Sequence, residues 1–177
     1  MTSGPRRSSA RHAKLPAPDE YGRFVGQIEL ADIWLMEASV TNSHGPRAPS
    51  RASVGITSPE ASWSNASDGF DVELPYVVEF ADGGTVHARL SATFGLHFTS
   101  GMPMTDSLFD VFTDINLPIN TWPFLREFVS TTLGRMGWQS FTLPAFKHGM
   151  PDPGEDDADA AAKPKRRTTR RPKAQGA

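Results

Sequence analysis

Residues 116–144 read NLPINTWPFLREFVSTTLGRMGWQSFTLP and form the most strongly patterned stretch of the chain. Asn120 or Thr121 is a candidate N-cap, and Pro123 is tolerated in a first helical turn because that turn has no acceptor for its missing N–H. Gly137 is placed where a helix would need a left-handed residue to stop. One stripe at helical spacing holds Leu125, Phe128, Val129, Thr132 and Met136. The stretch therefore predicts a long helix.

A shorter helix is predicted just upstream, over residues 104–115. It should end before Pro118, because the residue before a proline avoids helical geometry. Three carboxylates recur at four-residue spacing on one of its faces: Asp106, Asp110 and Asp114. Such a row is either a solvated helix face or an acidic docking face for a basic partner.

Four segments earlier in the chain predict strands: 28–42, 50–64, 70–80 and 85–98. The last two alternate apolar and polar residues around Gly83-Gly84, which predicts a long antiparallel hairpin. The second is expected at a sheet edge, because Pro59 removes a ladder donor. The first also allows a helix over 28–37. This order predicts an α+β fold, with a four-stranded antiparallel sheet covered by a short and a long C-terminal helix.

The two ends of the chain are polar, charged and rich in proline, and this composition is typical of disorder. We expect a flexible basic arm over 1–25, a folded domain over 26–147, and a disordered tail over 148–177 that is first acidic and then basic. The formal net charge is only −2, yet residues 25–147 carry 13 acidic and 6 basic side chains. An acidic domain disfavours binding to a phosphate backbone and suits a cationic partner.

The sequence also excludes several classes of chemistry. It has no cysteine, so disulfides and thiol catalysis are excluded. No nucleophile elbow, phosphate-binding glycine loop or HExxH motif occurs, so we expect neither an enzyme nor a cofactor or metal. His87 and His97 share one strand face, but about 30 Å separates positions ten residues apart, so they are expected to act independently. Neither a membrane span nor a signal peptide is visible, and we expect a cytoplasmic protein without membrane insertion.

The long-helix region carries a set of short motifs with a family likeness. The motifs are Trp122-Pro123-Phe124, Arg126-Glu127, Gly134-Arg135 and Leu143-Pro144. They resemble the SecB export-chaperone family, and more closely its divergent SecB-like branch linked to toxin–antitoxin systems. The chain departs from the family at Gln139-Ser140, where a Pro-Pro or Pro-Gln step is usual.

The resemblance implies an ATP-independent holdase that binds unfolded or nascent polypeptides, either preproteins for export or an antitoxin-like client. It further implies dimers with eight-stranded sheets, a homotetramer built as a dimer of dimers, and a translocase motor ATPase as a partner. The side chains expected to line an exposed client groove are Trp34, Met36, Trp122, Phe124, Leu125 and Phe128. The competing interpretation is an ordinary core with an oligomer interface.

Two other functions are open from the sequence. The basic tail could neutralise nucleic-acid phosphates through Lys165, Arg166, Arg167, Arg170 and Arg171. It has no interleaved aromatic residues for base stacking, and the acidic stretch before it could mask it. The third hypothesis is a small-ligand-binding α+β domain, which would have a closed pocket in a monomer.

Overall fold

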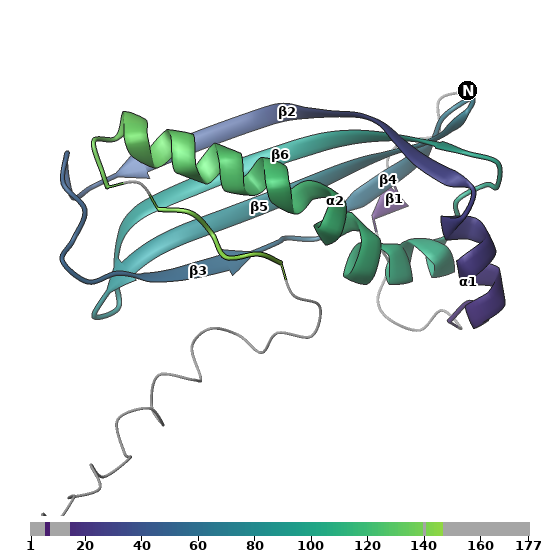
Figure 1. Ribbon diagram of the computed structural model, residues 1–177, viewed down its shortest axis with the longest axis horizontal. Helices are drawn as coiled ribbons and strands as arrows, with labels where there is room; N and C mark the ends of the chain where they lie inside the picture. The colour runs from purple at the N-terminus through teal and green to yellow at the C-terminus, as the bar shows by residue number, and fades with distance from the viewer. Residues whose placement is uncertain (1–5, 8–14, 140, 147–177) are drawn as a thin grey trace, which may run out of the picture.

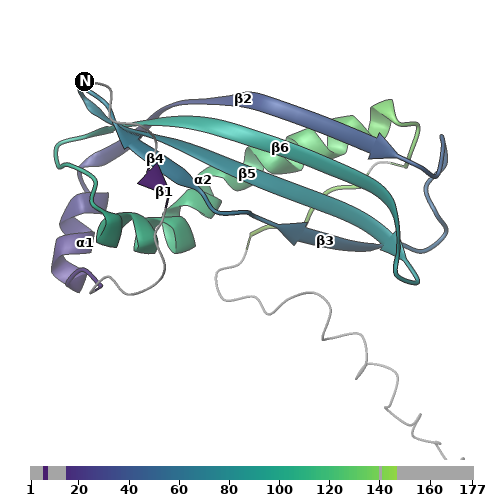
Figure 2. The same cartoon turned by 180° about the vertical axis from the view of Figure 1, so that it is seen from behind.

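The structure is a computed structural model that describes residues 6–7, 15–139 and 141–146. Its elements are β1 (Arg6–Arg7), α1 (Pro18–Val25), β2 (Ile28–Asn42), β3 (Ser53–Thr57), β4 (Ser62–Asn65), β5 (Gly69–Asp82), β6 (Thr85–Ser100) and α2 (Asp106–Arg135). Figure 1 shows two layers, a twisted sheet with both helices on one face. Seen from behind in Figure 2, the strands lie in front of α2, and no described helix covers that face. The predicted α+β class is confirmed.

The sheet is antiparallel throughout, and its centre is the predicted β5–β6 hairpin. Gly83 and Gly84 join the two strands with φ values of 55° and 83°, as a two-residue hairpin turn requires. β2 pairs with β6 from Ile28 opposite Ser100 to Asn42 opposite Ala88, so 28–42 is a strand and the helical alternative is wrong. No other described strand pairs with the second edge of β2.

The predicted strand 50–64 is two strands, and the break between them follows from proline. β3 and β4 both pair with β5, while residues 58–61 between them leave the ladder at Pro59. Pro75 of β5 lies opposite this gap. Proline cannot donate to a ladder, so both prolines lie where the pairing is interrupted. β1 extends the sheet beyond β4, an addition that the sequence did not predict.

α2 is one continuous helix, so the predicted helix end before Pro118 is wrong. Thr105, not Asn120 or Thr121, is the N-cap, and its side chain accepts a hydrogen bond from the backbone N–H of Leu108. The helix continues because Leu117 and Thr121 are fully buried, and this packing outweighs the roughly 3 kcal/mol cost of an interior proline.

The two interior prolines still change the shape of α2. Pro118 and Pro123 each lack the N–H of an intrahelical bond. Figure 1 shows the helix changing direction near its middle, as expected at prolines. The side chains of Asn120 and Thr121 donate back to the carbonyl oxygens of Asn116 and Leu117.

α2 ends where the sequence predicts. Gly137 has φ 78°, and its N–H donates to the carbonyl of Gly134, while Trp138 donates to the carbonyl of Leu133. These two bonds form a Schellman motif, which satisfies carbonyls at the end of the helix.

The predicted flexible arm is wrong over residues 18–25, because these residues form α1. Phe24 is fully buried, and its ring lies 6.0 Å from that of Phe70 and 6.1 Å from that of Phe112. Tyr21, Phe24 and Val25 form an apolar stripe at helical spacing, and all three pack into the core. The boundary of the folded domain therefore lies before Pro18. The predicted tail 148–177 lies outside the described residues.

Candidate binding groove

A groove of about 970 Å³ lies between α2 and the broken edge of the sheet. Its sheet side is formed by residues 58–61, with Ile56 of β3 and with Leu74 and Tyr76 of β5. Its helix side runs along α2 from Asp110 to Trp122. We call it the proline groove, because Pro59 and Pro118 both line it.

Proline explains why the groove is at this place. An unbroken edge strand would continue the sheet beneath the helix, but the chain leaves the ladder at Pro59. A straight helix would follow one line across the sheet, but α2 bends at its prolines. The groove therefore lies where both layers are interrupted.

The groove has an aromatic wall at one end. Trp122 is half-buried there, and its ring lies 5.5 Å from that of Phe146. The indole Nε1 of Trp122 donates to the carbonyl oxygen of Pro144 at 2.7 Å. Figure 1 shows the chain after α2 running back beside the helix. The hydrogen bond holds this returning segment at the groove.

A buried hydrogen bond joins sheet and helix at the base of the groove. The hydroxyl of Tyr76 lies 2.7 Å from Thr121 Oγ1, which lies 2.9 Å from the carbonyl oxygen of Leu117. Thr121 has one hydroxyl hydrogen, which the carbonyl accepts, so Tyr76 is the donor in the first bond. Burial raises the pKa of Tyr76, and the phenol stays protonated at neutral pH.

The charged residues that line the groove are all acidic. They are Glu60, Asp110 and Asp114, and no basic side chain is among the described lining residues. The third predicted carboxylate, Asp106, is exposed in the first turn of α2, where a negative charge favours the helix dipole. The predicted acidic face is thus divided, with two of its members in the groove. Burial, with the charge of Asp114, raises the pKa of nearby Tyr21 to about 12.

The predicted client residues of α2 do not share one surface. Trp122 lines the groove, but Leu125 is fully buried, so its predicted place in an exposed groove is wrong. Leu125 belongs to the helix row that faces the sheet. Phe124 is 41% exposed, and residues two apart on a helix point about 200° apart. Phe124 and the half-buried Phe128 therefore lie on the flank of α2 away from the groove.

Trp34 and Met36 lie on β2, at the opposite edge of the sheet, and are 45% and 47% exposed. Trp34 packs on Gly95, on the sheet face away from α2. The structure thus separates them from Trp122.

Sequence patterns did not point to Ile56, Glu60 and Tyr76 as groove residues. Pro59 was the available signal, since it marked an interrupted edge.

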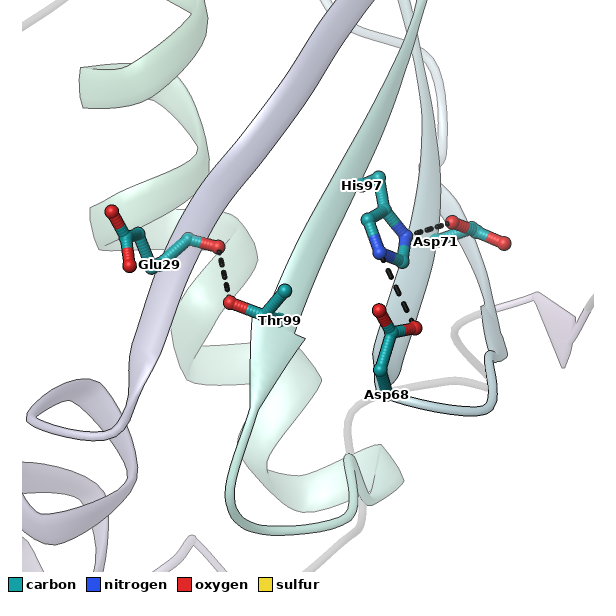
Figure 3. Close-up of polar contacts among 5 residues, drawn as sticks. All are labelled: Glu29, Asp68, Asp71, His97 and Thr99. Carbon is teal, nitrogen blue, oxygen red and sulfur yellow. Dashed lines mark hydrogen bonds and ion pairs between the residues drawn. The ribbon is translucent and has the colours of Figure 1, made fainter.

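A separate polar cluster lies on the uncovered sheet face (Figure 3). His97 Nδ1 is 2.7 Å from Asp71 Oδ1, and its Nε2 is 3.5 Å from Asp68 Oδ1. The bond to Asp71, with the charges of both carboxylates, raises the pKa of His97 above its ordinary value of 6.5. His87 instead contacts His44, with ring centroids 4.6 Å apart. Among the described residues, no group of three or more potential ligands is arranged to hold a metal ion.

The fold defined above is an antiparallel sheet with a long helix across one face. A solved structure of the Mycobacterium tuberculosis Rv1957 SecB-like chaperone, in complex with a ChAD peptide from the Rv1956 HigA1 antitoxin, is similar with a TM-score of 0.61. The similarity covers 73% of this chain and 99% of that chain, at 16% sequence identity. The chain therefore has a SecB-like fold.

Two other comparisons gave no relative: no family model matches the sequence, and no curated protein matches it. None of the helices that the structure describes is both long and apolar enough to cross a membrane. The predicted nucleic-acid contacts Lys165, Arg166, Arg167, Arg170 and Arg171 lie outside the described residues.

Proposed function

We propose that this protein is a chaperone that holds unfolded or nascent polypeptide segments in the proline groove without using a nucleotide. The observation that carries the proposal is the groove itself, which combines an aromatic wall with an acidic lining on a SecB-like fold. No described feature of the groove requires a cofactor.

The composition of the groove suits clients of varied sequence. Apolar contacts with Ile56, Val111 and Trp122 are non-directional, so they do not require one client geometry. The carboxylates would favour segments that carry Lys or Arg beside apolar residues. A volume of about 970 Å³ is at the upper end of the usual range for ligand sites, so the groove would hold a short segment of a client.

We further propose an antitoxin-like client rather than a preprotein. The similar chaperone was solved with an antitoxin peptide, which supports this choice. Protein export and docking of a translocase motor stay predictions.

Self-association is proposed through the edge of β2. The apolar side chains exposed along this strand are Trp34, Leu35, Met36 and Val40, each between 45% and 47% exposed. An apolar edge strand with an unpaired side is prone to pair with another strand. Pairing of two copies there would join two sheets, as expected for a dimer within a homotetramer.

The proposal is tested by light scattering from an aggregating test client, with the full-length protein and no ATP. Suppression is expected near a stoichiometric ratio. Trp122→Ala should need about thirtyfold more protein for equal suppression, because a buried aromatic anchor at an interface contributes ~2 kcal/mol. Phe124→Ala is the matched control, since Phe124 is an exposed aromatic residue on the other flank of the same helix.

Each variant is first checked for an unchanged unfolding transition. Equal suppression by folded Trp122→Ala and wild type would show that the groove is not the client site. Absence of suppression by the folded wild-type protein, against several unrelated clients, would reject the chaperone proposal. Sizing by multi-angle scattering tests the assembly, and Leu35→Lys in β2 should shift it toward the monomer.

A further inference from the structure

The C-terminal segment 163–173 complements the proline groove in charge. Its sequence KPKRRTTRRPK carries seven Lys and Arg residues and no acidic residue. The groove is lined by three carboxylates, of which Glu60 and Asp114 are exposed.

The chain leaves the described region at the groove itself. Pro144 accepts the hydrogen bond from Trp122, and Phe146 is part of the groove wall. Residues 147–162 are the 16 residues between this point and the basic segment. An extended chain of that length spans about 53–58 Å, so the basic segment can return to the groove without strain.

Such a tether makes even weak binding effective. A short linker gives an effective concentration in the millimolar range. At about 1 mM, a groove with an intrinsic Kd of about 0.1 mM would be occupied roughly nine-tenths of the time.

The chemistry of the segment also suits the aromatic wall. Arginine guanidinium groups stack on indole rings and bind carboxylates in a bidentate fashion. Their aliphatic stems cover apolar surface while the charge stays in water. Trp122 and Asp114, both lining the groove, provide one partner of each kind.

We infer that the basic segment 163–173 of the same chain docks in the proline groove and competes there with clients. The competition rests on the proposed function, whereas the docking does not. The rival occupant is the N-terminal arm, because Leu15 also lines the groove and Arg11 and Lys14 precede it. The C-terminal segment is favoured because its positive charge is greater.

Paramagnetic relaxation in the full-length chain tests the docking. The chain has no cysteine, so a spin label on Thr168→Cys is at a unique site within the basic segment. The label should broaden the amide signals of Ser58, Glu60, Ala61 and Asp114, but not those of residues 34–36 on β2. The effect should vanish in roughly 0.5 M NaCl, because salt screens charges at a surface.

Three controls identify the contact. The double substitution Glu60→Gln and Asp114→Asn should abolish the broadening, and Asp68→Asn with Asp71→Asn should not. Replacing Arg11 and Lys14 of the N-terminal arm with Gln should leave the broadening from Thr168 unchanged. To test for contact between chains, chains that carry the spin label but no nitrogen-15 are mixed with nitrogen-15 chains that carry no spin label. The groove signals of the nitrogen-15 chains should stay sharp in this mixture. Broadening only between chains, or no broadening from Thr168, would overturn docking by the chain's own basic segment.

Competition is measured with a fluorescent synthetic peptide of alternating Arg and Leu. Replacing all seven basic residues of 163–173 with Gln should lower the Kd of the peptide about tenfold. In the wild-type chain the basic segment would occupy the groove about nine-tenths of the time, so only about one-tenth of the grooves would be free to bind the peptide. Neutralising Glu155, Asp156, Asp157 and Asp159 is the matched control and should not lower the Kd. An unchanged Kd in the Gln variant would overturn the competition. Failure of the peptide to bind either chain, with the broadening intact, would reject the proposed function while the docking stands.

Discussion

Trp34 covers Gly95, its cross-strand partner, so closely that the indole fills the space where a side chain at position 95 would begin. Gly95 is therefore buried on the sheet face that no described helix covers. The contact fixes the exposed indole against β6. Any side chain at position 95 would push Trp34 off the sheet.

Gly95→Ala should therefore lower the free energy of unfolding by about 1–3 kcal/mol, because an added methyl group has no room beside the indole. Urea unfolding measures the effect. Gly55→Ala in β3 is the control and should change stability by less than about 0.5 kcal/mol, since nothing lies within 4 Å of a Cβ there. In a Trp34→Ala background, Gly95→Ala should cost much less. An equal cost in both backgrounds would show that the indole is not the obstacle.

The bond from Tyr76 to Thr121 predicts an asymmetry between two substitutions. Tyr76→Phe removes the donor and should cost about 0.5–1.5 kcal/mol, because Thr121 keeps its bond to Leu117. Thr121→Val preserves shape but leaves the phenol without its acceptor, and should cost about 1–3 kcal/mol. Chemical unfolding of both variants measures the difference. If Tyr76→Phe cost more, the assignment of Tyr76 as the donor would be wrong.

Helix α1 should be necessary for a stable domain. Phe24→Ala should lower the free energy of unfolding by about 3–5 kcal/mol, the usual cost of truncating a buried aromatic side chain. Deletion of residues 1–25 should cost at least as much. Leu15→Ala, at a side chain 72% exposed, is the control and should have little effect. If deletion of residues 1–25 were harmless, the core would not require α1.

The cluster around His97 predicts a pH dependence. Because the folded-state pKa is raised above 6.5, the protonated imidazolium stabilises the fold fully below pH 6.5. That stabilisation is lost as the pH rises through the folded-state pKa. His97→Gln should therefore cost more stability at pH 5.5 than at pH 8.5, by less than about 1 kcal/mol, since both carboxylates are largely exposed.

An NMR titration of the imidazole measures this pKa directly. Asp71→Asn should move the pKa of His97 toward 6.5, because the bond to Asp71 is the main cause of the shift. Asp82→Asn, at the distant end of β5, should leave the pKa of His97 unchanged. A pKa at or below 6.5 in the wild-type chain would contradict the contact with Asp71.

Local patterns made much of the fold predictable. The hairpin of β5 and β6 follows from alternation and from Gly83-Gly84, and the end of α2 follows from Gly137; both depend on neighbouring residues only. The helical path through Pro118 depends on burial of Leu117 against the sheet, which no local pattern reveals. Phe24 was assigned to an arm because its neighbours are polar and its partners are distant in sequence.

The site was less predictable, because the groove joins residues that are far apart in the chain. Ile56 and Glu60 precede Asp114 by more than fifty residues. The helical spacing of apolar residues placed Trp122 and Leu125 on the same helix. It did not show which flank of that helix meets the broken sheet edge. Leu125 lies on the row that faces the core, so it is buried. Exposed and buried apolar residues look alike in a sequence.

The pairing of β2 with β6 has a consequence during synthesis. β2 is complete at residue 42, but its partner strand is complete only at residue 100. At ~5–20 residues per second, the ribosome needs about 3–12 s to make the intervening chain. Throughout that interval the apolar strand is newly emerged and unpaired, and is itself an aggregation hazard. A protein proposed to protect other nascent chains therefore begins as one that needs protection.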